Sequence, residues 1–169
     1  MRVVPRKVSL SSQGVDGGLF VFALPHPRQA VEVCAIQTLT EQDRALIAAA
    51  RAAIARNYDG VHFNFTVGAA VRCAGGRVYT GVNVYSLHGA CAEQVALGAA
   101  ITQGERTFET IVAVRGPEGD EIIPPCGNCR QILCDYAPDC QVILAPDGVP
   151  GKVPARELLP WAYRAKSEE

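Results

Sequence analysis

The residues of this chain best suited to chemistry are three cysteines in two short phrases. Cys91 opens the phrase Cys-Ala-Glu, which ends at Glu93, and further along Cys126 and Cys129 belong to Pro-Cys-Gly-Asn-Cys. Three thiolates can hold a zinc ion and leave its fourth coordination position open for water. Glu93 is near enough to the first ligand to transfer that water's protons without binding the metal. The pattern therefore predicts a catalytic zinc site with Glu93 as general acid and base.

The same cysteines could instead form a structural or a redox site. A Cys-x-x-Cys pair alone is more often a structural zinc knuckle or a redox pair, and a fourth ligand such as Cys134 or Cys140 would close the site. The complete phrase is more specific than either half, because it includes Glu93 and the Pro124-Pro125 pair. We therefore expect an open, catalytic site.

Both cysteine phrases fall where helices are predicted to begin. A helix N-terminus carries roughly half a positive charge, which favours thiolate over thiol. Arg130, directly after Cys129, is expected to donate hydrogen bonds to the sulfurs and to offset their negative charge. We therefore assign Arg130 to a supporting position beside the three ligands.

The elements that must position these residues alternate between helix and strand. A capping box at Thr40 and Asp43 opens a helix to about Arg56, and Gly75-Gly76 marks a hairpin. The further elements are helices over 91–103 and 126–136, strands over 63–72, 77–84, 110–114 and 141–144, and a short helix over 153–160. This alternation predicts an α/β fold, a sandwich around one sheet of about five strands.

Length and composition limit the class of protein. The chain has 169 residues, enough for one domain, and residues 1–37 differ from the rest because they show no sustained helical period. We treat 1–37 as an N-terminal extension, either an added strand or a mobile arm, and 38–169 as the zinc-dependent domain. The remaining cysteines fall in or beside apolar stretches and are expected to be buried free thiols: Cys34, Cys73, Cys134 and Cys140.

Charge and hydropathy exclude some partners. The net charge is −1, so the chain lacks the basic field that draws nucleic acid to a protein. No apolar run approaches the roughly 20 residues of a membrane span, and no signal-peptide pattern is present. We expect no nucleic-acid or membrane partner and a cytoplasmic location.

Four further residues are candidates for either a functional or a structural role. His88 lies near the ligands, but its Gly-bordered loop favours a pocket-wall or surface role. Trp161 and Tyr163 are expected either to cover a ligand or only to anchor the chain end. Asn83 is a candidate for reading a substrate hydroxyl, although Asn at a strand end is ordinarily a turn former.

Residues 38–160 resemble the cytidine deaminase family. Four motifs carry the resemblance: Phe65-Thr66-Val67-Gly68-Ala69-Ala70, Thr80-Gly81-Val82-Asn83-Val84, Cys91-Ala92-Glu93 and Pro125-Cys126-Gly127-Asn128-Cys129-Arg130-Gln131. The resemblance implies a three-layer α/β/α sandwich with a mixed sheet. It also implies a homotetramer with one zinc per subunit and with pockets completed by neighbouring chains. In that family geometry the Ala92 N–H orients the C2 carbonyl of the base, Phe65 stacks near the base, and Asn83 bonds the sugar region.

One departure narrows the expected substrate. Nucleoside-specific members follow the Asn with a residue and then a Glu that holds the ribose, whereas this chain has Tyr85 at that position. The run around Tyr85, and the tail from Arg156 to Pro160 with Tyr163, look closer to the blasticidin-S deaminases. That branch ends in Tyr-x-Trp, whereas this chain has Tyr163-Arg164-Ala165.

The resemblance therefore implies hydrolytic deamination of a cytosine ring, with C4 amine converted to carbonyl and ammonia released. The substrate implied is blasticidin S or a related aminoacylnucleoside, which would make the chain an antibiotic-resistance enzyme. The alternative within the same class is deamination of cytidine or deoxycytidine in pyrimidine salvage. From another class, a zinc-stabilised protein that only binds a nucleoside is disfavoured, because Glu93 is retained.

Overall fold

The computed structural model describes residues 36–164. The predicted N-terminal extension over 1–37 therefore lies outside the described residues except for Ile36 and Gln37, and so does Cys34. Gln37 forms an antiparallel bridge with Lys152, in which each backbone N–H donates to the other's carbonyl at 3.0 Å.

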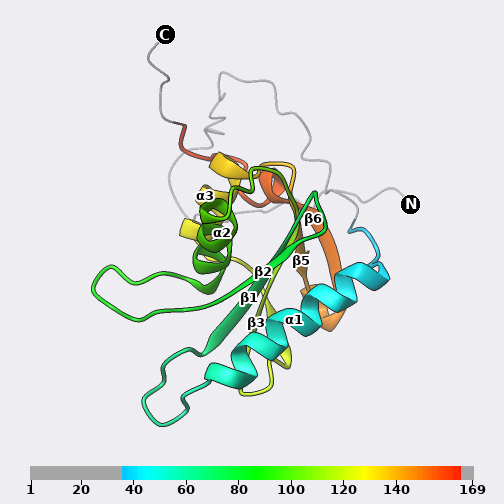
Figure 1. Ribbon diagram of the computed structural model, residues 1–169. Helices are drawn as coiled ribbons and strands as arrows, with labels where there is room; N and C mark the ends of the chain where they lie inside the picture. The colour runs from blue at the N-terminus through cyan, green and yellow to red at the C-terminus, as the bar shows by residue number, and fades with distance from the viewer. Residues whose placement is uncertain (1–35, 165–169) are drawn as a thin grey trace, which may run out of the picture. The chain divides into compact units, whose positions relative to one another are not determined.

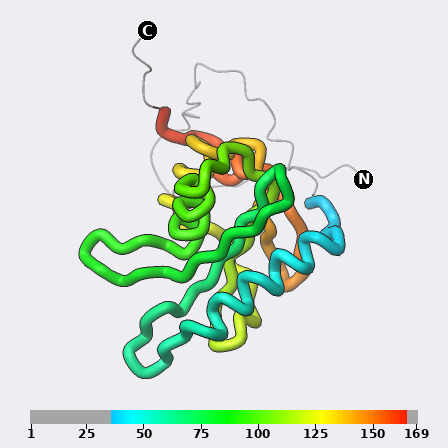
Figure 2. The backbone as a smooth tube through the Cα atoms, viewed as in Figure 1, coloured from blue at the N-terminus to red at the C-terminus, as the bar shows by residue number. Residues whose placement is uncertain are grey.

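One mixed sheet forms the centre of the described region (Figures 1 and 2). Its strands are β1 (Val67–Cys73), β2 (Val78–Val82), β3 (Phe108–Arg115), β4 (Glu121–Ile123), β5 (Gln141–Leu144) and β6 (Gly151–Pro154). The strand order is β2-β1-β3-β5-β6, with β4 also paired to β3. Only the β3–β5 pair is parallel. The predicted α/β class with a mixed sheet is confirmed, with six strands in place of about five.

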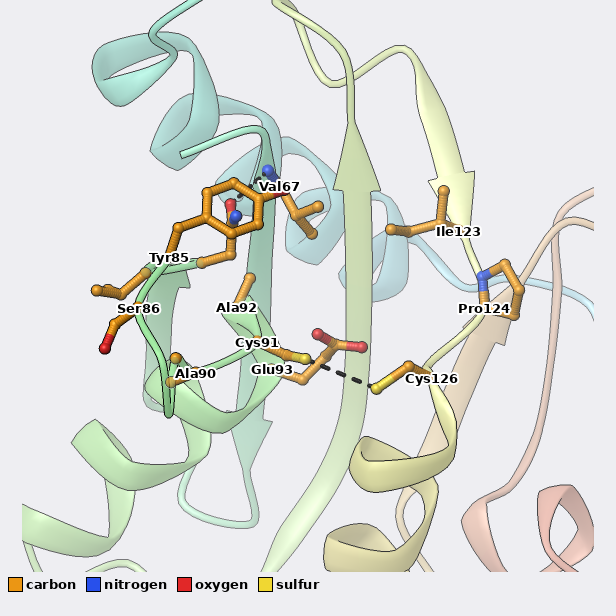
Figure 3. Close-up of a pocket in the computed structure, with 13 residues that line it drawn as sticks. Val67, Tyr85, Ser86, Ala90, Cys91, Ala92, Glu93, Ile123, Pro124 and Cys126 are labelled. Atoms are coloured by element: carbon orange, nitrogen blue, oxygen red, sulfur yellow. Dashed lines mark hydrogen bonds between the residues drawn. The ribbon is translucent and has the colours of Figure 1, made fainter. Parts of the chain in front are cut away.

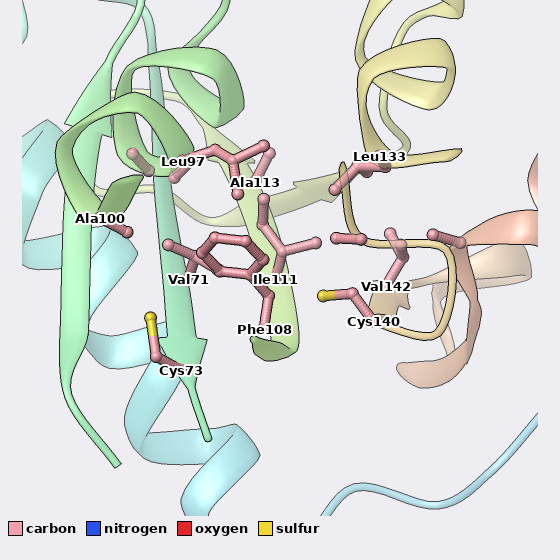
Figure 4. Close-up of a cluster of buried hydrophobic side chains, with 14 of the residues drawn as sticks. Val71, Cys73, Leu97, Ala100, Phe108, Ile111, Ala113, Leu133, Cys140 and Val142 are labelled. Carbon is pink, nitrogen blue, oxygen red and sulfur yellow. The ribbon is translucent and has the colours of Figure 1, made fainter. Parts of the chain in front are cut away.

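Helices cover both faces of this sheet: α1 (Glu41–Asn57), α2 (Ala92–Thr102) and α3 (Gly127–Tyr136). Because side chains alternate along a strand, neighbouring residues of β1 enter different cores. Ala70 packs with Leu46 and Ile54 of α1, whereas Ala69 and Val71 pack with α2 and α3. The larger core, on the α2 and α3 side, is shown in Figure 4. The result is the expected three-layer α/β/α sandwich.

Glycines let two helices approach the sheet closely. A Cβ atom on Gly81 of β2 would lie 2.6 Å from the Ala96 nitrogen and 2.7 Å from the Ala92 carbonyl oxygen, both in α2. A Cβ on Gly68 of β1 would lie 2.7 Å from the Ala50 carbonyl oxygen in α1. Such contacts are too short for any side chain, so glycine at these positions fixes how near each helix lies to its strand.

Strand β3 helps to position the start of α3, because β4 and β5 pair with different parts of the same edge of β3. Its whole first edge pairs with β1. Along the other edge, Thr110 and Ile111 pair with β5, whereas residues 113–115 pair with β4. After β4 the chain runs through Pro124-Pro125 to Cys126, so α3 begins beside the point where β4 and β5 part.

A buried carboxylate links α1 to the sheet. Asp43 is fully buried and accepts hydrogen bonds from Lys152 Nζ at 2.7 Å, from Arg72 at 3.1 Å, and from both the N–H and the hydroxyl of Thr40. Burial alone would raise its pKa, but these donors outweigh burial and hold the pKa of Asp43 well below its usual range. Arg72 also donates to Glu109 at 3.0 Å and to Thr110 at 2.9 Å.

The sequence predictions were wrong at two segments. Residues 63–66 do not continue β1, because Phe63 and Phe65 adopt positive φ angles of 56° and 52° inside a loop. The predicted helix over 153–160 is divided between β6 and a 3₁₀ turn at Ala155–Leu158. Among the described helices, none has both the length and the hydrophobicity needed to cross a bilayer.

Candidate active site

The three predicted ligands meet between the starts of α2 and α3. Cys91 and Cys126 are the N-cap residues of these two helices, and Cys129 lies in the first turn of α3. The Sγ atoms of Cys91 and Cys126 are 3.6 Å apart, and all three sulfurs lie within 4.8 Å of one another. Residues far apart in the chain thus present three sulfur atoms at one point, and Figure 3 shows two of them, those of Cys91 and Cys126.

This geometry fits a tetrahedral zinc ion. Zn–S bonds of about 2.3 Å place two thiolate ligands roughly 3.8 Å apart, close to the separation of Cys91 and Cys126. The remaining cysteines are not part of the cluster: among the described residues, the group that could hold a metal is Cys91, Cys126 and Cys129. Cys73 and Cys140 are buried and free, as expected, whereas Cys134 is only half-buried. No fourth cysteine of the described region closes the site, so the donor set is that of an open zinc centre.

The two helix starts act unequally on the thiols. Burial opposes ionisation of Cys126, yet hydrogen bonds from the Cys129 N–H, from the Cys91 and Cys129 thiols and from the Asn128 N–H outweigh it and lower the pKa of the Cys126 thiol. For Cys91 and Cys129, burial dominates and raises the pKa. Backbone N–H groups at the start of α3 thus favour the thiolate at one ligand, and bound zinc would favour ionisation of the other two.

Glu93 lies beside the sulfur cluster without being one of its ligands. Its side chain comes from the first turn of α2, is only 7% exposed, and points toward Cys91 and Cys126 (Figure 3). Burial raises the pKa of the Glu93 carboxyl. A carboxyl with a raised pKa can both accept and return a proton near neutral pH.

A cavity of about 370 Å³ opens in front of Glu93. It is lined by Val67, Asn83, Val84, Tyr85, Ser86, Gly89, Ala90, Cys91, Ala92, Glu93, Ile123, Pro124 and Cys126. Glu93 is the one carboxylate among these lining residues, and they include no Lys, Arg or His. A volume of this size accommodates a small organic molecule.

Two predicted substrate residues face this cavity with defined hydrogen bonds. Asn83 is 7% exposed, and its Oδ1 accepts from the Val67 N–H at 2.8 Å. Its Nδ2 forms no hydrogen bond within residues 36–164. The Tyr85 hydroxyl lies 3.2 Å from Thr66 Oγ1. Ala92, also in the lining, brings the first N–H groups of α2 to the cavity.

The structure places Arg130 differently from the sequence prediction, and three other candidate residues lie outside this chain's cavity. Phe65 and Tyr163 do not line this chain's cavity, and Tyr163 is 74% exposed. Arg130 donates to the carbonyls of Pro125 at 2.8 Å and Leu158 at 3.4 Å, and within the described region it forms no hydrogen bond to a cysteine sulfur. Arg130 therefore supports the ligand loop through its backbone. His88 lies exposed in its loop and does not line the cavity.

One residue that supports a ligand and seven residues of the cavity wall were not predicted from the sequence; the wall residues are Val67, Val84, Ser86, Gly89, Ala90, Ile123 and Pro124. Gln94 accepts at Oε1 from the Cys91 N–H at 3.0 Å and so fixes the backbone of the first ligand. Its position three residues after the N-cap is that of a capping box, a signal present in the sequence. Ile123 and Pro124 come from the end of β4, a strand too short to give a sequence signal.

Comparison with known proteins agrees with this geometry. Residues 40–145 match the family described as the cytidine and deoxycytidylate deaminase zinc-binding region. The chain belongs to this deaminase family. It is a zinc-dependent enzyme that hydrolytically deaminates cytosine nucleosides, and zinc is its cofactor.

Individual relatives of this deaminase are similar over most of its length. Blasticidin-S deaminase of Bacillus cereus is 38% identical over 135 residues, 74% of this chain and 94% of that protein. A probable cytidine deaminase of Dictyostelium discoideum is 37% identical over 103 residues, 59% of this chain and 69% of that protein. A crystal structure of cytidine deaminase from Burkholderia pseudomallei superimposes with a TM-score of 0.61 at 36% identity, covering 74% of this chain and 100% of that one.

Proposed function

We propose that this deaminase acts on blasticidin S or a related aminoacylnucleoside, and thereby confers resistance to the antibiotic. Cytidine and deoxycytidine are the alternative substrates. The proposal rests first on Tyr85. Its side chain stands in the cavity lining, 63% exposed, where the ribose-holding Glu of nucleoside-specific relatives is expected. The similarity to blasticidin-S deaminase over 94% of that protein's length supports the same substrate class.

Tyr85 changes what the sugar end of the cavity can bind. A carboxylate accepts two hydroxyl hydrogen bonds at once, whereas a phenol offers one hydroxyl and a large apolar ring. The Tyr85 hydroxyl is already within reach of Thr66, at 3.2 Å. We infer that this end of the cavity selects against an ordinary ribose and accepts a modified sugar.

The charges of the lining support a nucleoside in preference to a nucleotide. No Lys or Arg is among the residues that line the cavity. A phosphate group entering it would lose its hydration without gaining the charge-assisted hydrogen bonds that Arg or Lys supplies. A 5′-phosphorylated substrate is therefore disfavoured.

The lining residues receive the following proposed roles. Cys91, Cys126 and Cys129 hold zinc, which when bound makes a water molecule acidic enough to react near neutral pH. Glu93 accepts one proton from that water and passes it to the ring nitrogen beside C4, while the hydroxide adds to C4. Glu93 then accepts the second proton from the new C4 hydroxyl and delivers it to the amine, which leaves as ammonia when the C4 carbonyl forms. The Ala92 N–H orients the C2 carbonyl. Asn83, whose Oδ1 is occupied by Val67, donates from Nδ2 to a sugar oxygen.

We further propose a cytoplasmic homotetramer, in which neighbouring chains complete the pockets and Phe65 and Tyr163 contact substrate. Two loops beside the cavity support an assembly, because both carry exposed apolar side chains. Val61 and Phe63 in one loop are 83% and 71% exposed, and Leu87 in the other is 93% exposed. Such a concentration of exposed apolar surface marks an interaction site.

The decisive experiment compares blasticidin S with cytidine by the fall in cytosine ultraviolet absorbance and by ammonia release. We expect kcat/KM for blasticidin S to exceed that for cytidine by at least about 100-fold, since lost hydrogen-bond partners in a built site give discrimination of this order. Equal rates on both compounds would defeat the specialised substrate and leave the alternative.

A pair of variants tests the role of Tyr85 directly. Tyr85→Glu restores the carboxylate and is expected to raise the rate on cytidine while lowering that on blasticidin S. Tyr85→Phe removes only the hydroxyl and serves as the matched control, with the preference for blasticidin S retained. A Tyr85→Glu variant whose preference is unchanged would show that Tyr85 does not select the sugar.

A further inference from the structure

One face of α3 holds the chain segment that follows β6. Three residues of this face, Arg130, Gln131 and Cys134, reach the segment Ala155–Tyr163. Cys134 is four residues after Arg130 and three after Gln131, so it neighbours both on the helix surface. The same helix supplies Cys126 and Cys129 from its first turn. The terminal segment and two metal ligands are thus attached to one short helix.

Gln131 makes the most complete of these contacts. Its Nε2 donates to the Tyr163 carbonyl at 2.7 Å, and its Oε1 accepts from the Tyr163 N–H at 3.0 Å. Nε2 also donates to Asp135 Oδ1 at 2.9 Å, one helical turn further on, which fixes the orientation of the amide. One side chain therefore satisfies both backbone groups of Tyr163, as a neighbouring β-strand would.

Arg130 extends this attachment to the ligand loop. Its guanidinium bridges the carbonyl of Pro125, which precedes Cys126, and the carbonyl of Leu158 at the end of the 3₁₀ turn. Leu158 in turn packs against the core cluster beneath α2 and α3. Any movement of the first turn of α3 is thereby transmitted to residues 158–163.

We propose that Gln131 is a positioning residue that fastens the terminal segment Leu158–Tyr163 to α3, and that zinc bound at Cys126 and Cys129 tightens this fastening. The physical reason is the length of α3. A helix of 10 residues is marginal by itself and depends on its attachments. Metal ligation immobilises its first turn, and Gln131 lies only two residues beyond Cys129. Linkage is reciprocal, so the fastened segment also raises the affinity for zinc. The inference does not depend on the substrate.

The chain contains suitable reporters for this inference. Trp161, the single tryptophan, lies inside the fastened segment and is 88% exposed. Arg164 follows Tyr163 directly, and trypsin cleaves after arginine only when the flanking backbone can leave its contacts. Trypsin cleavage after Arg164 and the fluorescence anisotropy of Trp161, which falls as the segment gains mobility, therefore report release of the segment without any measurement of activity.

The test compares the full-length wild type with Gln131→Ala, each with zinc bound and with zinc removed. In the zinc-loaded enzyme, Gln131→Ala is expected to speed cleavage after Arg164 about tenfold, as the loss of two backbone hydrogen bonds implies. Removing zinc from the wild type should also speed this cleavage, reversibly on adding zinc back. In Gln131→Ala, zinc removal should add little, because the fastening through which zinc acts is already lost. Gln103→Ala, at the end of α2, is the matched control, since that side chain forms no hydrogen bond within residues 36–164.

Each result decides one part of the proposal. Unchanged cleavage and unchanged Trp161 anisotropy in zinc-loaded Gln131→Ala would overturn the fastening itself. An equal effect of zinc removal in wild type and Gln131→Ala would overturn the coupling through Gln131. A weaker zinc affinity in Gln131→Ala than in Gln103→Ala, measured by equilibrium competition with a chromophoric chelator, would support it from the opposite direction.

Discussion

Gly81→Ala is the substitution that most directly tests how the fold positions the site. The added Cβ would lie 2.6 Å from the Ala96 nitrogen, 2.7 Å from the Ala92 carbonyl oxygen and 2.8 Å from Val95 Cβ. Two of these atoms belong to the backbone of α2, so no rotamer change can relieve the contact. Since non-bonded heavy atoms need about 3.4 Å or more, α2 must move away from β2 by roughly 0.8 Å.

That movement acts on both stability and rate. Overpacking of this kind costs about 2 kcal/mol, which corresponds to a fall in Tm of about 6 °C for a domain of this size. Cys91, Ala92 and Glu93 move with the helix, and a displacement near 1 Å lowers the rate by up to about 100-fold. We therefore expect kcat/KM to fall at least about 30-fold in protein that is still folded.

The assay combines thermal unfolding, zinc content per chain and kcat/KM on the better of the two substrates. Gly75→Ala is the matched control, because Gly75 lies in the hairpin just before β2 and its added Cβ would meet nothing within 4 Å. Wild-type Tm and kcat/KM in Gly81→Ala would refute the reasoning. A lowered Tm with unchanged kcat/KM would show that the movement of α2 stops short of Glu93.

Three further outcomes are expected. Glu93→Gln should retain zinc and wild-type Tm but lose about 1,000-fold or more in turnover, and substantial residual activity would remove Glu93 from proton transfer. Gly98→Ala, inside α2 where an added Cβ meets nothing within 4 Å, should raise the free energy of unfolding by about 0.5–1 kcal/mol in urea titrations; destabilisation would contradict the open space assigned to this position. Asp43→Asn should cost about 3 kcal/mol at pH 7. Because the folded-state pKa of Asp43 is lowered, its contribution is present above about pH 4 and is lost as the pH falls further, so wild type and Asp43→Asn should converge in acid; a gap that persists at low pH would contradict this assignment.

Local sequence patterns predicted the helices and the metal ligands well. The face of α1 formed by Leu46, Ile47 and Ile54 is buried as its period indicates. Cys91 and Cys126 cap their helices as predicted, because ligand spacing and helix start are properties of a few neighbouring residues. These patterns involve residues only a few positions apart in the sequence, so they can be interpreted without knowledge of any tertiary contact.

The errors occur where distant contacts decide the local structure. Phe63 and Phe65 have high strand propensity, yet Asp59 accepts from the Val61 and His62 N–H groups and bends this segment into a loop. β6 was missed because its four residues include a Gly and a Pro, and its pairing with β5 supplies the order that propensity lacks.

The same contrast between local sequence patterns and distant contacts applies to the active site. The ligands and Glu93 were predicted by spacing, whereas part of the cavity wall was not, because Ile123 and Pro124 reach it only through the pairing of β4 with β3. Arg130 was assigned to the sulfurs from its neighbour Cys129. Its actual partners include Leu158, which no local pattern connects to it.

The buried carboxylate of Asp43 also bears on how the chain folds in time. Its partner Lys152 lies 109 residues away in the sequence, and its partner Arg72 lies 29 residues away. Closing so long a loop is slow, and the charges stay hydrated until β6 has joined the sheet. We expect this cluster to form after the rate-limiting step of folding. Weakening this cluster would then leave the folding rate nearly unchanged and raise the unfolding rate. Asp43 therefore slows unfolding of the native state without speeding its formation.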